Sequence, residues 1–111
     1  MLLTAVMSGF DGISSTNSCG LPELILRAYR AIEKGDAATA RDLHRLWYPF
    51  RALAREFGQP QTVKAAMNLR GFDGGSVRLP LRDLEPAKVA QVAEVLRAMA
   101  TDRRSNVALA A

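Results

Sequence analysis

Apolar residues recur every three or four positions through much of this chain, which is the spacing of one face of an α-helix. The pattern is longest between residues 36 and 57, where the apolar positions are Ala40, Leu43, Trp47, Phe50, Ala54 and Phe57. It predicts a helix that packs along its whole length, capped by Asp36 and bent at Pro49, which has no backbone N–H to donate. We expect Trp47, at the centre of the apolar face, to be buried.

Three shorter segments show the same spacing. Residues 22–34 predict a helix that begins at Pro22 and is ended by Gly35. Its predicted buried stripe is Leu21, Leu24 or Ile25, Ala28 and Ile32. Residues 60–70 predict a helix that is ended by Gly71 and has Val63, Ala66 and Met67 on its apolar face. The last helix begins near Pro86 and buries Val89, Val92, Leu96 and Met99.

The remaining segments carry different signals. Residues 1–9 predict the end of a helix that Gly9 terminates. A short buried strand is expected at residues 12–16, and a loop is expected at residues 17–20. Residues 71–84 contain three glycines and Pro80, which favour an irregular loop. The final ten residues, 102–111, have neither a cap nor a clear partner, so they predict a flexible tail.

Length and composition limit the class of protein. With 111 residues, 49% apolar and 23% charged, the chain suits one small globular domain. Its apolar runs fall far short of the ~20 residues that span a bilayer, and its start lacks the pattern of a signal peptide. These features predict a cytoplasmic protein with no membrane partner.

The net charge of +4 raises the question of a nucleic-acid partner. The arginines of the two central predicted helices are interrupted by Glu33, Asp36, Asp42 and Glu56, as on a solvated helix face. Only Arg103 and Arg104 stand apart, and two charges supply little affinity for phosphates. We therefore expect no nucleic-acid partner.

The candidates for metal or cofactor chemistry are weak. Cys19 is the only cysteine and His44 the only histidine, so the chain lacks the cluster that a zinc site needs. Asp73-Gly74-Gly75 matches no phosphate-binding loop and reads as a turn. We predict no metal and no cofactor.

A longer motif is more informative. The stretch from Asn68 to Leu81, Asn-Leu-Arg-Gly-Phe-Asp-Gly-Gly-Ser-Val-Arg-Leu-Pro-Leu, follows a predicted helix bearing Val63-Lys64. Shorter motifs accompany it: Gly12-Ile13-Ser14-Ser15, Pro22-Glu23-Leu24 and Lys34-Gly35-Asp36. With them, roughly residues 1 to 100 resemble the C-terminal third of the dihydrodipicolinate synthase/N-acetylneuraminate lyase family. Members of that family are (β/α)8 barrels that form a Schiff base between a lysine and a 2-keto acid, and they carry extra C-terminal helices.

The resemblance implies a mostly α fold containing part of a TIM barrel, since a complete barrel needs about 250 residues. Residues 1–35 would be the last helix–strand–helix of the (β/α)8 barrel, namely the end of helix 7, strand 8 and helix 8. Residues 36–101 would be the C-terminal helical region. The spacing of Ser14-Ser15 to Pro22 matches the 5-dehydro-4-deoxyglucarate dehydratase branch better than the synthases.

The same resemblance bears on the site residues. Family active sites open where the strands end, so Ser15 is the candidate for binding a substrate hydroxyl or carboxylate. The alternative is that Ser14 and Ser15 are small because barrel strands pack tightly and their hydroxyls satisfy nearby backbone groups. Lys64 matches a lysine on a helix outside the barrel, so no residue here matches the Schiff-base lysine, and we predict no catalytic residue. We expect a packing role for Tyr29, Tyr48 and Cys19. The family pattern implies that Arg78 pairs with a carboxylate on the helices.

The resulting hypothesis is the C-terminal part of a Schiff-base lyase or dehydratase that acts on a 2-keto acid, inactive alone. The alternative is a non-catalytic helical interaction module, or a subunit that completes a partner chain. A strand without neighbours has two unpaired edges, and such edges recruit other chains. We therefore expect self-association or a partner chain.

Overall fold

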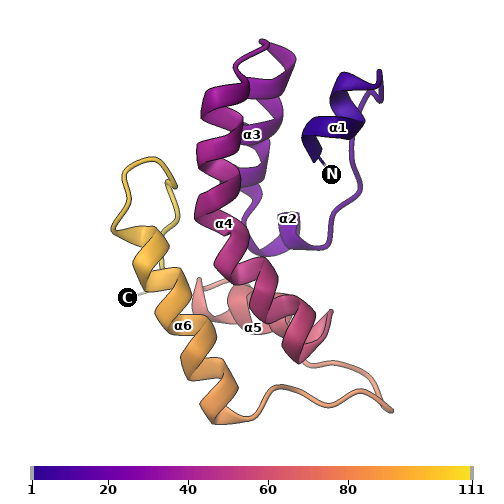
Figure 1. Ribbon diagram of the computed structural model, residues 1–111. Helices are drawn as coiled ribbons and strands as arrows, with labels where there is room; N and C mark the ends of the chain where they lie inside the picture. Colours follow the sequence, from indigo (N-terminus) through magenta and orange to yellow (C-terminus); the bar gives the residue numbers. More distant parts are fainter. Residues whose placement is uncertain (1, 111) are drawn as a thin grey trace.

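The computed structural model describes residues 2–110 as an arrangement of helices joined by irregular segments (Figure 1). The elements in chain order are α1 (Leu2–Met7), α2 (Asn17–Gly20), α3 (Pro22–Glu33), α4 (Ala37–Phe57), α5 (Gln61–Leu69) and α6 (Pro86–Ala100). Helices α3 and α4 form a hairpin, α5 and α6 pack against α4, and α1 lies beside α3. The chain is therefore mostly helical, as the periodicity predicts.

Helix α4 confirms the longest predicted pattern. The Asp36 carboxylate accepts a hydrogen bond from the Thr39 backbone N–H at 3.0 Å, which caps the helix and lowers the pKa of Asp36. Gly35 precedes it with φ of 75°, a left-handed conformation that glycine adopts without strain. Pro49 lies inside the helix, and Trp47 is only 6% exposed.

One main core joins α3, α4, α5 and α6. The largest fully buried apolar side chains at its centre are Leu21, Leu24, Phe50, Val92 and Leu96, and Ala66 of α5 is fully buried beside them. Most positions predicted to be buried are buried, whereas Phe57, Met67 and Val89 are only partly so. The buried faces of α3, α4, α5 and α6 thus cover one another, and this packing supplies the stability that short helices lack in isolation.

Two local predictions near the N-terminus are wrong. The predicted strand at residues 12–16 is absent: residues 12–15 form no regular secondary structure, and no strand occurs between residues 2 and 110. A strand needs a second strand to receive its backbone hydrogen bonds, and this part of the chain offers none. Residues 17–20, predicted as a loop, form α2, whose Gly20 is buried and faces Ala66 and Phe50.

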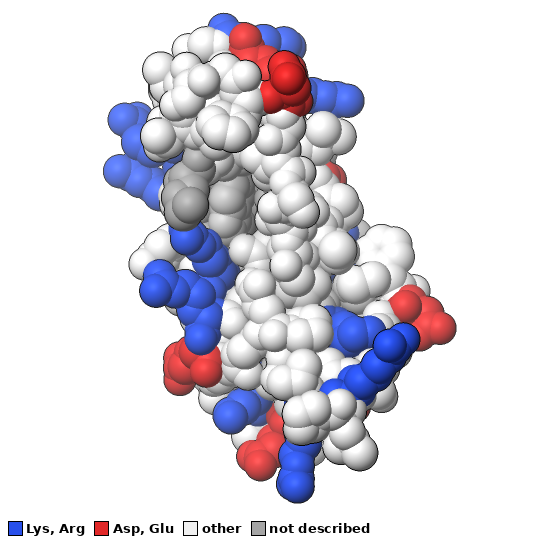
Figure 2. Space-filling view, turned by 90° about the vertical axis from the view of Figure 1, so that its right-hand side faces the viewer, with Lys and Arg blue, Asp and Glu red and all other residues white. Residues whose placement is uncertain are grey.

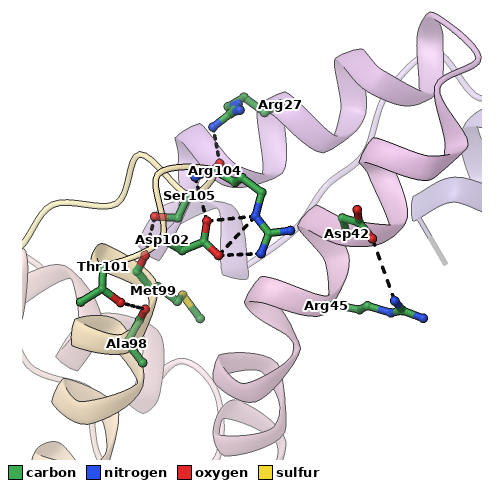
Figure 3. A network of polar contacts seen from close by, with 9 residues as sticks. All are labelled: Arg27, Asp42, Arg45, Ala98, Met99, Thr101, Asp102, Arg104 and Ser105. Atoms are coloured by element: carbon green, nitrogen blue, oxygen red, sulfur yellow. Dashed lines mark hydrogen bonds and ion pairs between the residues drawn. The ribbon is translucent and has the colours of Figure 1, made fainter.

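The C-terminal segment folds back beside α3 and α6 (Figure 3). The Ser105 hydroxyl donates to the Met99 carbonyl at 2.7 Å and accepts from the Val107 backbone N–H at 3.0 Å. Arg27 donates to the Arg104 carbonyl, and the Arg104 guanidinium hydrogen-bonds to Asp102, lowering the pKa of that carboxyl to about 2. The burial of Ser105 and Val107 differs from the flexible tail that the sequence suggests.

Candidate functional site

An open groove of about 430 Å³ lies between the 13–17 segment and helices α1, α3 and α4. Its apolar lining consists of Leu2, Ala5, Ile13, Ile25 and Trp47. Its polar lining consists of Ser14, Ser15, Asn17, His44 and Arg51. The candidate residue Ser15 therefore lies in a groove, together with side chains that come from a helix 29 or more residues later in the chain.

Ser15 is half-buried at the end of the irregular segment. Its backbone carbonyl accepts a hydrogen bond from the Ser18 N–H at 3.1 Å, in the turn that leads into α2. Within residues 2–110 its hydroxyl makes no hydrogen bond to another protein group. That hydroxyl is consequently available to donate to, or accept from, a molecule in the groove.

The cationic side of the groove comes from α4. Arg51 follows His44 by seven residues, which is two helical turns, so both side chains lie on one face of the helix. Partial burial and the nearby Arg51 charge lower the pKa of His44, which favours a neutral imidazole. Arg51 forms no ion pair with any carboxylate between residues 2 and 110. The spacing of His44 and Arg51 is visible in the sequence, but nothing there connects them to Ser15.

The groove can bind but lacks a group for imine chemistry. Hydroxyls, an amide and a guanidinium are hydrogen-bond donors that suit a carboxylate. The residues that line it include no lysine, tyrosine, aspartate or glutamate. A Schiff base requires an amine, which none of these side chains supplies, whereas the His44 imidazole is able to transfer a proton.

Lys64 lies on α5, outside the groove, and its side chain contacts the start of the 71–84 loop. Its Nζ donates to the Gly74 carbonyl, while the Asn68 side-chain oxygen accepts from the Gly74 N–H at 2.8 Å. Lys64 and Asn68 are one helical turn apart on α5, so together they bind both backbone groups of Gly74, its N–H and its C=O. The spacing of Lys64, Asn68 and Gly74 thus anchors the loop to α5, and the Lys64 ammonium group is engaged in this contact.

Gly74→Ala is expected to destabilise this anchor. A methyl group at position 74 would lie 2.7 Å from the Lys64 carbonyl oxygen and 3.0 Å from the Asn68 side-chain oxygen, so the loop must shift. Overpacking of this kind costs about 1–3 kcal/mol. Urea unfolding measures the loss, with Gly12→Ala as the control because nothing lies within 4 Å of a methyl group there. Equal stability of the two variants would contradict the anchoring role.

Other sequence candidates fall outside the groove. The Tyr29 hydroxyl donates to the Asp11 carbonyl at 2.9 Å, and Tyr48 is half-exposed beside His44 rather than packed in the core. Cys19 is exposed, unlike the apolar packing role predicted for it. Arg78 is exposed and pairs with no carboxylate in the described part of the chain, so its predicted ion pair is absent.

No cluster of three metal-ligating side chains occurs between residues 2 and 110. Among the helices of that range, none combines the length and the hydropathy that a membrane span requires.

Comparison with known proteins identifies the class. The profile of the dihydrodipicolinate synthetase family matches residues 1–99, and the chain belongs to this family. It is 40% identical over 97 residues to a 4-hydroxy-tetrahydrodipicolinate synthase of Methanosphaerula palustris, covering 86% of this chain and 33% of that protein. It is 42% identical over 84 residues to a probable 5-dehydro-4-deoxyglucarate dehydratase of Rhizobium meliloti, covering 68% of this chain and 28% of that protein.

An uncharacterised DapA-like lyase of Halobacterium salinarum shows the same partial coverage. It is 39% identical over 77 residues, which are 69% of this chain and 25% of that protein. The chain therefore spans a quarter to a third of the length of these relatives. The family resemblance read from the motifs is confirmed.

Proposed function

We propose that this chain is the C-terminal part of a Schiff-base lyase or dehydratase that acts on a 2-keto acid. The observation that carries the proposal is the family match along residues 1–99, combined with coverage of only a third of the synthase. Relatives named as a synthase and as a dehydratase both support a lyase-type parent. In this proposal residues 1–35 are the end of a (β/α)8 barrel, in which residues 12–16 would become the last strand only beside the neighbouring strands of the parent. Residues 36–101 are the helical region that follows it.

The proposed role of Ser15 is to contact a hydroxyl or carboxylate of the substrate. Its free hydroxyl and its position in the groove support that role. Arg51 adds a cation on the same groove, which favours the carboxylate of a keto acid over an uncharged substrate. The groove lining has no amine, so we infer that the chain is inactive alone.

Borohydride trapping with pyruvate tests this inference. We expect the mass of the chain to remain unchanged, because Lys64, the lysine most easily mistaken for a nucleophile, is bonded to the Gly74 carbonyl. Intact-protein mass spectrometry gives the readout, and a full-length synthase of the family under the same conditions is the positive control. A stable adduct on Lys64 in a peptide map would overturn the assignment.

A second candidate function is a non-catalytic helical interaction module. Exposed apolar side chains near the N-terminus favour it, namely Leu3, Met7, Phe10 and Ile13. Such a patch marks an interaction surface in a soluble protein.

A further inference from the structure

Helix α2 is held at both of its ends by residues that flank α5, beside which it lies (Figure 1). The side-chain oxygen of Asn17, the first residue of α2, accepts a hydrogen bond from the Gln59 side chain at 3.0 Å. The carbonyl of Gly20, the last residue of α2, accepts one from the Arg70 guanidinium group at 2.5 Å. Gln59 precedes α5 by two residues and Arg70 follows it directly, so the two sides of α5 hold the two ends of α2.

Arg70 is turned into the molecule, unlike the basic side chains at the surface. In the face that Figure 2 shows, lysine and arginine side chains extend outward from the edges. The Arg70 side chain is only 5% exposed, and besides Gly20 it binds the Glu23 carboxylate and, at 2.9 Å, the Ala108 carbonyl. A guanidinium group that donates in several directions at once has a fixed orientation. Arg70 therefore fixes Gly20 relative to α3 and to the C-terminal segment.

The end of α2 also packs directly on α4 and α5. Gly20 is buried, and a methyl group at this position would lie 3.5 Å from the Ala66 side chain and 3.6 Å from the Phe50 ring. A helix of four residues has no stability of its own, because helix formation begins with a costly first turn. These contacts and the two hydrogen bonds from Gln59 and Arg70 therefore determine where α2 lies.

A series of hydrogen bonds joins α2 to Ser15. The Ser15 carbonyl accepts from the Ser18 backbone N–H at 3.1 Å and from the Ser18 hydroxyl at 2.5 Å. One residue further on, the Thr16 carbonyl accepts from the Cys19 backbone N–H at 3.1 Å. Residues 15–20 are thus one connected unit, and two of them, Ser15 and Asn17, line the groove. A displacement of α2 would therefore move polar side chains of the groove.

We propose that Gln59 and Arg70 are positioning residues that act through α2 to hold Ser15 and Asn17 in place in the groove. Neither Gln59 nor Arg70 lines the groove, so their influence on a bound molecule passes through residues 15–20. This role rests on the proposed function, in which Ser15 contacts the substrate. The contacts that support it join residues 15–108 of this chain to one another.

Cys19 supplies a probe of α2 itself. It is exposed, it lies between the two held ends of α2, and it is the only cysteine, so a thiol-reactive nitroxide labels this helix alone. In wild type we expect the electron paramagnetic resonance spectrum of a label with restricted motion. Gln59→Ala and Arg70→Lys should each make the label more mobile, because alanine has no donor and lysine lacks the planar fork of donors.

Arg78→Lys is the matched control for Arg70→Lys. Arg78 is exposed and has no carboxylate partner between residues 2 and 110, so the label spectrum should stay as in wild type. Circular dichroism and Trp47 fluorescence separate a local effect on α2 from unfolding. Gln59→Ala keeps the test valid if Arg70→Lys fails to fold, since it removes only an exposed hydrogen bond.

A pyruvate titration of ¹⁵N-labelled protein adds a readout at the groove, through the amide signals of Ser15 and Asn17. We expect Gln59→Ala to weaken pyruvate binding about fivefold, the effect of one neutral hydrogen bond. The positioning role would be overturned by unchanged label spectra in the folded variants, or by equal pyruvate affinity of Gln59→Ala and wild type. If pyruvate shifts neither amide in wild type, the substrate contact of Ser15 is wrong, and the label spectra alone decide whether Gln59 and Arg70 hold α2.

Discussion

Trp47→Ala is expected to lower the free energy of unfolding by about 3–5 kcal/mol, the usual cost of removing a large buried aromatic side chain. Trp47 is 6% exposed and belongs to the cluster that joins α3, α4, α5 and α6. Its ring also meets that of His44 in an edge arrangement, with centroids 4.9 Å apart. A loss of this size can unfold a domain whose total stability is about 5–15 kcal/mol.

Trp47→Phe is the matched control. The indole Nε1 is buried and has no hydrogen-bond partner in the described part of the chain, so phenylalanine keeps most of the packing and removes an unpaired donor. We expect it to cost much less than alanine in urea unfolding. As Trp47 is the only tryptophan, its fluorescence reports this site alone. Two results together would show that Trp47 does not face the core: fluorescence emission typical of a tryptophan in water, and an alanine variant with the same unfolding transition as wild type.

Arg70→Met is expected to cost about 3 kcal/mol, because removing one partner of a buried ion pair leaves the other uncompensated. The Arg70 side chain is 5% exposed and pairs with Glu23 of α3 through two guanidinium nitrogens. The same guanidinium group donates to the Gly20 carbonyl and, at 2.9 Å, to the Ala108 carbonyl. We choose the lower end of the 3–5 kcal/mol range since Glu23 keeps a quarter of its side chain exposed to water.

Arg78→Met serves as the comparison for Arg70. Arg78 is exposed, and within residues 2–110 it has no carboxylate partner, so its replacement should stay within about 0.5 kcal/mol of wild type. Thermal unfolding of both variants gives the measurement. If Arg70→Met has the same melting temperature as wild type, the contacts of Arg70 do not hold α2, α3 and the C-terminal segment to α5.

Local signals predicted most of the helices. The three- and four-residue spacing of α4, its Asp36 cap and the glycine before it all act within a few residues, so the sequence alone identifies them. α2 was missed because its four residues, Asn-Ser-Cys-Gly, are typical of a turn. The strand at residues 12–16 was wrong because a strand depends on a partner that local sequence does not specify.

The candidate site depends on long-range packing. Ser15 was proposed from family resemblance, and its proximity to Arg51 follows from the way α4 folds against the 13–17 segment. The Arg70–Glu23 pair joins residues 47 apart, and the Ser105 hydrogen bonds hold a segment without any helical pattern. None of these contacts has a periodic signal in the sequence.

The central claim, that this chain is the C-terminal part of a longer Schiff-base lyase, is tested most directly by reading the coding DNA upstream of Met1. We expect an in-frame extension that encodes further alternating strands and helices, including a strand that bears a lysine for the imine. An in-frame stop codon directly upstream of Met1, with no such extension, would contradict the claim and favour an independent helical module.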